Sequence, residues 1–95
     1  MRNLRFAVAV AGAITAGVVF AQSGADVVKA KGCLTCHAVS QKKIGPAYKD
    51  VAAKYKGDAG AEGKLVAKLK DGKDHPKVVA SDAEFKAAVG YVLSQ

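Results

Sequence analysis

Two cysteines and a histidine stand close together in the run Cys33-Leu34-Thr35-Cys36-His37. Two thiols three positions apart, followed at once by an imidazole, form the pattern by which haem is covalently attached. The thiols bond to the two vinyl groups of the haem, and the adjacent imidazole binds the iron. The pattern therefore predicts one covalent haem c on Cys33 and Cys36, with His37 as an iron ligand.

Two other kinds of site use cysteines at this spacing, a redox-active dithiol and half of a zinc site. A dithiol of this kind is normally carried by a βαβ framework, and no alternating run here is long enough to predict a sheet. A zinc site needs two more ligands, and the two histidines, His37 and His75, are 38 positions apart in the sequence. Neither alternative fits as well as haem attachment.

The first residues of the chain predict export. Arg2 and Arg5 precede an uncharged and almost wholly apolar stretch over residues 6–20, which is followed by the small residue Ala21. The stretch is short for a membrane span of about 20 residues, and a small residue at its end suits a signal peptidase. We expect residues 1–21 to be a cleaved signal peptide, and residues 22–95 to form one haem-carrying domain in the periplasm without a membrane anchor.

A domain of this size needs more than its own side chains to be stable. Residues 22–95 number 74 and contain no tryptophan, and alanine and valine supply much of their apolar fraction. Chains this short bury too little surface for a stable core and usually add disulfides, a metal or a large cofactor. Two cysteines three positions apart would close too short a loop to help much, so we expect a haem to complete the core.

The first half of the mature chain predicts two short helices. One is expected over residues 25–31, ended by Gly32 immediately before the first cysteine. The other is expected over residues 47–55, opened by Pro46, because proline is tolerated best in the first turn of a helix.

The second half predicts two more helices. Apolar residues recur at helical spacing over residues 61–70, and Asp71-Gly72 should end that helix. Ser81 and Glu84 form a capping box that should begin the last helix. The apolar face of that helix consists of Phe85, Ala88, Val89, Val92 and Leu93.

From about residue 25 to its end, the chain resembles the class I cytochromes c, specifically the short bacterial monohaem type. The residues that carry the resemblance lie at 31–37, 44–55, 81–82 and 91–95 and read KGCLTCH, IGPAYKDVAAKY, SD and YVLSQ. The resemblance implies an all-α fold of about four short helices wrapped around one covalent haem c. It also implies that His37 is the proximal ligand, that the Pro46 carbonyl accepts the ring N–H of His37, and that Tyr91 packs against the first helix near Gly32. A simple helix stop is the alternative role for this glycine.

The sequence departs from the family at the distal ligand. The family usually has a methionine followed by proline a few residues before the Ser-Asp of the last helix, and this chain has His75-Pro76 there. The only methionine is Met1, which the expected cleavage removes. We therefore expect low-spin iron bound by His37 and His75, with a lower potential than methionine ligation provides. A lysine ligand or an open position is the alternative.

These features predict a carrier of electrons between redox partner proteins, or the electron-accepting subunit of a periplasmic oxidoreductase. A protein that binds or senses a small gas is the alternative, if the His75 bond is weak or absent. Nothing in the sequence resembles an acid–base pocket, so no enzyme activity is expected. The state of assembly should be a monomer or a small oligomer.

The distribution of lysines in the sequence bears on which class of molecule the protein binds. Several lysines fall in the first half of the mature chain, and they form either a basic rim that steers acidic partners or an ordinary solvated surface. Nucleic-acid binding is not expected, because of the export signal and because no arginine follows Arg5. The lysines are Lys29, Lys31, Lys42, Lys43, Lys49, Lys54 and Lys56.

Overall fold

The computed structural model describes residues 23–95, so the expected signal peptide at residues 1–21 lies outside the described residues. Within this range the fold is all-helical, as predicted, and contains no strand. No helix of the described range is long and apolar enough to cross a membrane. The elements in chain order are α1 (Gly24–Ala30), the 3₁₀ helix η1 (Cys33–Thr35), α2 (Tyr48–Lys54), α3 (Ala61–Asp71) and α4 (Asp82–Leu93).

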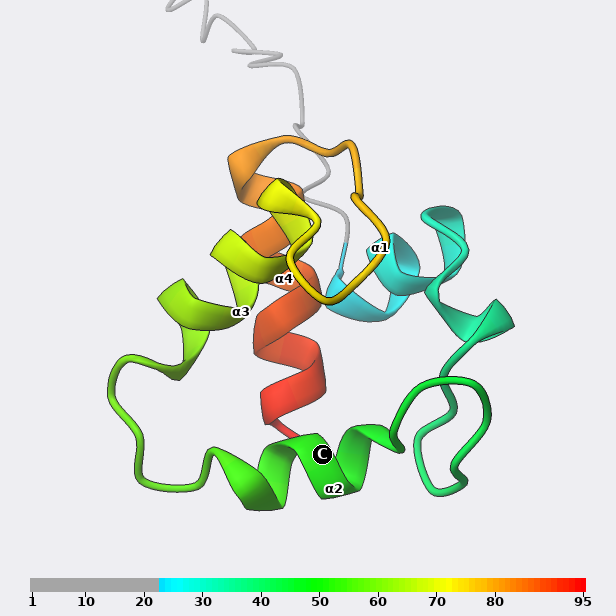
Figure 1. Ribbon diagram of the computed structural model, residues 1–95, viewed down its shortest axis with the longest axis vertical. Helices are drawn as coiled ribbons and strands as arrows, with labels where there is room; N and C mark the ends of the chain where they lie inside the picture. Colours follow the sequence, from blue (N-terminus) through cyan, green and yellow to red (C-terminus); the bar gives the residue numbers. More distant parts are fainter. Residues whose placement is uncertain (1–22) are drawn as a thin grey trace, which may run out of the picture.

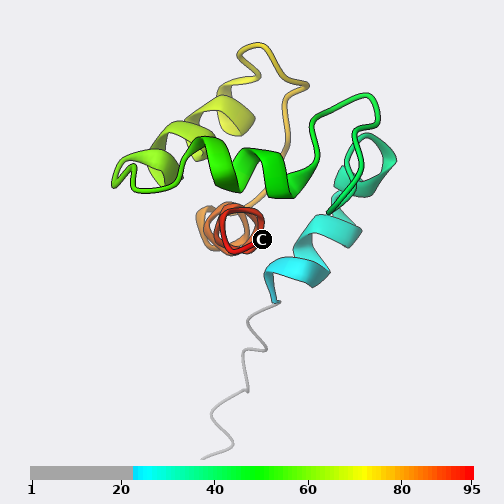
Figure 2. The same ribbon diagram turned by 90° about the horizontal axis from the view of Figure 1, so that it is seen from below.

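Helix α4 is the centre of the arrangement. Its backbone lies close to the backbones of α1, α2 and α3, whereas no two of these three helices approach each other as closely within the described residues. Figure 1 shows α4 running down the middle of the molecule, with α2 crossing near its end, and Figure 2 looks along α4 with the other helices around it. The three outer helices are therefore held together mainly through α4.

The start of α4 is the capping box that the sequence predicts. The Ser81 hydroxyl accepts a hydrogen bond from the Glu84 amide at 3.2 Å, and the Glu84 carboxylate accepts one from the Ser81 amide at 2.9 Å. These bonds satisfy two of the amides that a helix leaves free at its first turn. The face that begins at this box buries Phe85, Ala88 and Val89.

The close crossing of α1 and α4 occurs at Gly24, not near Gly32 as the resemblance implies. A Cβ atom added at Gly24 would collide with the Ala87 carbonyl oxygen and the Tyr91 Cβ atom. Gly32 has open space at its Cβ position and a φ of 73°, which glycine adopts without steric cost. Gly32 therefore ends α1 and turns the chain into η1, as the alternative interpretation predicts.

Helix α2 begins one residue later than predicted. Ala47 is its N-cap, with an extended ψ of 143°, and Pro46 lies just before the helix instead of in its first turn. No side chain caps this end. The amides of Tyr48 and Lys49 instead bond to the carbonyls of Ala38 and Val39, at 2.9 and 3.0 Å. Carbonyl groups of the loop after His37 thus cap the first turn of α2, and these bonds hold the loop against the helix.

The end of α3 follows the prediction closely. The helix extends to Asp71, and Gly72 ends it with a φ of 69°. Gly72 is also where the chain folds back, because a Cβ atom there would lie 3.0 Å from the Cβ atom of Lys77. The Val78 amide bonds to the Leu69 carbonyl at 3.0 Å. Residues 72–77 therefore form a tight loop closed against the end of α3.

The hydrophobic core is small. No large side chain of the described chain is completely enclosed. The main cluster joins α1, α2 and α4 through Val27, Val28, Tyr48 and Ala88. The buried apolar residues are Val27, Val28, Ala47, Tyr48, Ala61, Phe85, Ala88 and Val89.

Gly24→Ala should destabilise the protein, because the new methyl group would enter the space of α4. We expect a loss of about 1–3 kcal/mol in the free energy of unfolding, measured by chemical denaturation of the haem-loaded protein. Gly63→Ala in α3 is the matched control, because Gly63 has open space at its Cβ position. That change should stabilise the protein by about 0.5–1 kcal/mol. Equal effects of the two substitutions would contradict the close crossing at Gly24.

Candidate haem-binding site

The two cysteines are presented by a tight turn directly after α1. Gly32 reverses the chain, and the 3₁₀ helix then runs from Cys33 to Thr35. The amides of Cys36 and His37 both bond to the Cys33 carbonyl, at 3.2 and 3.0 Å. Both cysteines are free and partly buried. This compact turn holds the two thiols and the imidazole on one short, rigid piece of chain.

The environment of Cys33 does not resemble that of a reactive dithiol. Burial raises the pKa of the Cys33 thiol above its ordinary value. Redox-active cysteines instead have a lowered pKa, produced by a neighbouring positive charge or a helix N-terminus. The other alternative is a zinc site. Residues 23–95 contain no group of three His, Cys, Asp or Glu side chains that could hold a metal ion.

The orientation of His37 is set by the loop that leads to α2. Its ring nitrogen Nδ1 donates a hydrogen bond to the Pro46 carbonyl oxygen at 2.7 Å, the bond that the family resemblance implies. Gly45 lies against the ring so closely that a Cβ atom there would be 2.7 Å from Nδ1. The Gly45 amide bonds to the Cys36 carbonyl at 2.7 Å. With Nδ1 occupied, Nε2 is the nitrogen left to bind a metal.

Tyr48 supports the other side of this arrangement. Its ring packs near the His37 imidazole, with centroids 5.3 Å apart and planes at 25°. It also meets the edge of Tyr91 from α4, at 6.2 Å and 85°. Tyr48 is buried, and this burial raises the pKa of its phenol well above the usual value. The ring thus joins the turn that carries His37 to the core between α2 and α4.

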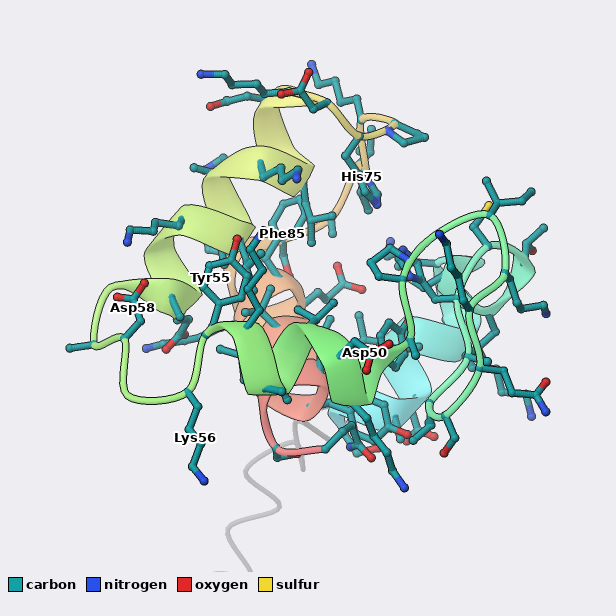
Figure 3. All side chains as sticks on the ribbon, turned by 60° about the horizontal axis from the view of Figure 1, so that its bottom comes forward. Asp50, Tyr55, Lys56, Asp58, His75 and Phe85 are labelled. Atoms are coloured by element: carbon teal, nitrogen blue, oxygen red, sulfur yellow. The ribbon has the colours of Figure 1, made fainter. Side chains whose placement is uncertain are left out.

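His75 lies in the loop after α3 and comes close to His37. The two ring centroids are 6.0 Å apart, and the ring planes are nearly parallel, at 8°. The Nδ1 atom of His75 donates a hydrogen bond to the Pro76 carbonyl oxygen at 2.7 Å. Figure 3 shows the His75 side chain directed away from α3. The structure therefore brings together two histidines that are far apart in the sequence.

Apolar side chains surround the space near these residues. A small hollow of about 20 Å³ adjoins Cys33 and is lined in part by Leu69, Val78 and Phe85. Two large apolar residues next in sequence to residues named above are mostly exposed: Ile44, directly before Gly45, at 84%, and Val79, directly after Val78, at 81%. A flat apolar cofactor between the loops would cover such side chains. The residues present therefore fit a haem group in chemical character.

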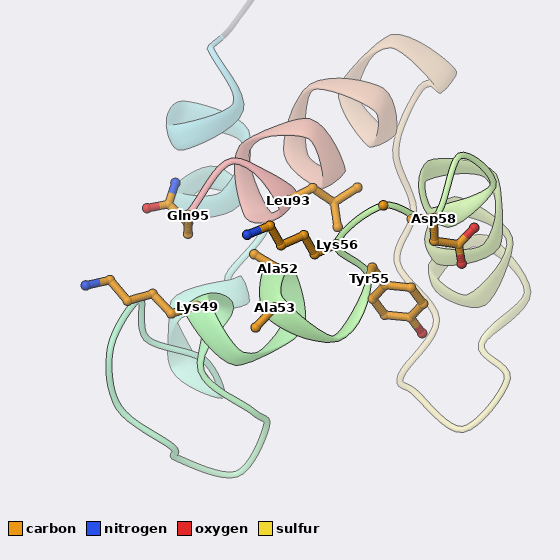
Figure 4. A pocket seen from close by; sticks show the side chains of 10 residues that line it. Lys49, Ala52, Ala53, Tyr55, Lys56, Asp58, Leu93 and Gln95 are labelled. Carbon is orange, nitrogen blue, oxygen red and sulfur yellow. The ribbon is translucent and has the colours of Figure 1, made fainter.

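A larger hollow of the described chain lies elsewhere. It has a volume of about 560 Å³ and lies between α2, the turn after it and the end of α4 (Figure 4). Lys49, Tyr55 and Leu93 are among its lining residues. It contains none of the cysteines or histidines. The chemistry of the motif is therefore not located in this hollow.

A model of the family described as Cytochrome c matches residues 21–95. The chain belongs to the cytochrome c family. One covalent haem c is the cofactor of this cytochrome, and electron transfer is the activity its relatives indicate. The relatives it matches are electron-transfer cytochromes, which are not enzymes. The predictions of fold class, family and cofactor are thereby confirmed.

Individual relatives cover most of the domain. The cytochrome is 41% identical over 91 residues to cytochrome c-551 of Pseudomonas aeruginosa, covering 88% of each chain. It is 39% identical over 83 residues to cytochrome c-552 of Nitrosomonas europaea, covering 79% of this chain and 81% of the relative. The crystal structure of the class 1 cytochrome MtoD from Sideroxydans lithotrophicus is similar, with a TM-score of 0.64 and 34% identity, covering 75% of this chain and 90% of that one.

Three residues of the site were not singled out by the sequence. Gly45 precedes a proline inside the polar loop, and such a Gly-Pro pair is a signal for a turn. Tyr48 is the only aromatic residue among the first several positions of α2, which is otherwise rich in small residues. Asp74 has a positive φ of 55°, and aspartate is one of the few residues that tolerate it. Gly45 and Tyr48 could therefore have been noticed in the sequence, whereas the backbone conformation of Asp74 could not.

Tyr48→Phe should reduce the loss of stability at alkaline pH. A phenol whose pKa is raised by folding ionises more readily in the unfolded chain, so its contribution is complete below about pH 10 and is lost as the pH rises further. We expect unfolding by urea to show a smaller loss between about pH 9 and pH 11 in this variant than in the unmodified cytochrome.

The matched control for Tyr48 is Tyr55→Phe, which removes another partly buried phenol but keeps the Tyr48 hydroxyl. This variant should still lose stability at alkaline pH as the unmodified cytochrome does, because it keeps the Tyr48 hydroxyl. If Tyr48→Phe and the unmodified protein lost stability equally, the phenol would not be buried in the folded state.

Proposed function

We propose that this protein is a periplasmic monohaem cytochrome c that transfers electrons between redox partner proteins. In this proposal Cys33 and Cys36 would carry the haem, and His37 and His75 would both bind its iron. The observation that carries the proposal is the pair of nearly parallel imidazole rings, 6.0 Å apart. Each ring already has its Nδ1 atom bonded to a carbonyl oxygen.

The spacing of the rings supports a shared metal ion. Two metal–imidazole bonds of about 2 Å each, with roughly 1 Å from each bonding nitrogen to its ring centre, would separate the two centroids by about 6 Å. The observed separation is 6.0 Å. The sequence offers no competing methionine, because its only one is Met1.

When bound, haem iron supplies a reversible one-electron couple. The chain's own residues keep both ligands in place through that change. The turn at Cys33 holds His37, and the loop closed by the bond between Val78 and Leu69 holds His75. Because imidazole favours the reduced iron less than a thioether does, we expect a lower potential than that of the family's methionine-ligated members.

The periplasmic location rests on the first residues of the chain. Cleavage after Ala21 leaves residues 22–95, and the match to the family begins at residue 21. Attachment of haem requires thiols delivered in a reduced state to an oxidising compartment, and export brings the chain to such a compartment. Cleavage after Ala21 and location in the periplasm are therefore consistent with each other.

The distribution of charge indicates where a partner would approach. Residues 23–56, which include the attachment motif, contain seven lysines and two aspartates, whereas residues 57–95 contain six lysines and six acidic residues. The net charge of the described chain therefore belongs entirely to the half that carries the cysteines and His37. All seven lysines are exposed, and only Lys31 is paired with a carboxylate, that of Glu84, within the described residues. We propose that this half faces acidic redox partners.

His75→Ala should abolish the low-spin spectrum of the oxidised cytochrome, because it removes one of the two ligands. His75→Met should instead retain low-spin iron and raise the reduction potential, because a thioether stabilises the reduced state. Visible and near-infrared spectra, together with an equilibrium redox titration, measure both effects.

The proposal of ligation by two histidines fails if His75→Ala keeps an unchanged low-spin spectrum. Carbon monoxide supplies an independent check on the reduced, unmodified cytochrome. Ready binding would indicate an open iron position and would favour a gas-binding protein over an electron carrier.

The rate of oxidation by hexacyanoferrate(III) should decrease as salt is added, because this anion is attracted by the basic half. Lys42→Gln combined with Lys49→Gln should lower the rate at low salt by several-fold and flatten its dependence on salt. Lys68→Gln combined with Lys86→Gln changes the net charge equally and is the matched control, since these residues lie in the neutral half. Equal effects of the two pairs would contradict an oriented basic surface.

A further inference from the structure

The two histidines of this cytochrome are held in the same way by two different prolines. His37 Nδ1 donates to the Pro46 carbonyl oxygen, and His75 Nδ1 donates to the Pro76 carbonyl oxygen, both at 2.7 Å. The first bond spans nine positions along the chain, whereas the second reaches only to the next residue. The second therefore depends on the local shape of one loop.

That loop has little freedom to change the direction of the Pro76 carbonyl. On its near side, Asp74 is held at a φ of 55°, a conformation that few residues other than glycine adopt. On its far side, Lys77 packs against Gly72, where its Cα atom would lie 3.3 Å from an added Cβ. The ring of Pro76 itself restricts its φ angle. The carbonyl is thus placed by constraints on both sides.

The same loop is closed at its base by a backbone bond. The Val78 amide donates to the Leu69 carbonyl at 3.0 Å, only two residues after Pro76. Two backbone donors at the end of α3, Gly72 and Lys73, also bond to the Lys68 carbonyl, at 3.0 and 3.2 Å. The loop that carries His75 is therefore anchored to the last turn of α3.

We propose that the Pro76 carbonyl is the positioning group of the second iron ligand. It fixes the proton of His75 on Nδ1, leaves Nε2 available to the metal, and holds the ring nearly parallel to that of His37. Hydrogen bonds of this kind orient metal-bound histidines and make them more basic. This inference rests on the proposed ligation by His75 and adds the group that controls it.

Two physical consequences follow from this role. A more basic imidazole donates more electron density to the metal and stabilises its oxidised state, so the bond to Pro76 should lower the reduction potential. Parallel ligand planes should give a rhombic low-spin signal in electron paramagnetic resonance of the oxidised cytochrome, whereas perpendicular planes give a single signal at a very large g value. The observed angle of 8° predicts the rhombic signal.

The decisive experiment replaces the proton of the bond by a methyl group, using His75→Nδ1-methylhistidine in the haem-loaded protein. We expect the reduction potential to rise while the spectrum stays low-spin, because Nε2 remains free to bind iron. A loss of the low-spin spectrum also supports the proposal, since a methyl group on a nitrogen facing solvent would leave ligation intact. An unchanged potential with an unchanged paramagnetic resonance signal overturns it.

His75→Nε2-methylhistidine is the matched control, because it moves the same methyl group to the nitrogen that should bind iron. This variant should lose the low-spin spectrum whatever Pro76 does. If it keeps that spectrum, the proposed ligation by His75 is itself wrong. The two variants therefore separate failure of this inference from failure of the proposed function.

A second measurement needs no substitution. In the reduced cytochrome, proton exchange at Nδ1 can be followed for both histidines by nuclear magnetic resonance. We expect His75 Nδ1–H to exchange slowly, as His37 Nδ1–H does, because each is bonded to a carbonyl oxygen. Exchange at His75 as fast as in a free imidazole would overturn the assignment of Pro76.

Discussion

Packing on helix α4 is the constraint on which the rest of this structure depends. Within residues 23–95 the backbones of the three other α-helices come close to α4 and not to one another. Their buried side chains are mostly small, and none of the larger ones there is fully enclosed. A chain this short gains too little from its own burial, so the haem c acts as part of the core as well as the redox group. Its covalent attachment keeps that part of the core in place.

Aromatic rings connect this core to the proposed iron ligands. The His37 ring is 6.0 Å from that of His75 and 5.3 Å from that of Tyr48, and Tyr48 meets Tyr91 of α4 at 6.2 Å. The position of His37 therefore depends on how α2 packs against α4. The Nδ1 atom of His75 is instead bonded within its own loop, to the Pro76 carbonyl oxygen at 2.7 Å.

The elements that could be predicted from the sequence are those with local causes. The capping box at Ser81 and the glycine stop at Gly72 act within a few residues, so their positions in the structure match the prediction. The start of α2 was predicted one residue too early, because loop carbonyls, and not Pro46, determine where that helix begins. The close crossing was assigned to Gly32 when it belongs to Gly24, since only the path of α4 decides which glycine lies beneath it.

By itself, the sequence determined the chemistry that this protein can perform. The spacing of Cys33, Cys36 and His37 is a covalent property of the chain, and it specifies haem attachment without knowledge of the fold. The tertiary structure alone decided the arrangement around that motif. It brought His75 within 6.0 Å of His37 and set the rings nearly parallel. These relations depend on the route of the chain through α3 and α4, because residues 38 positions apart have no local interaction that could place them.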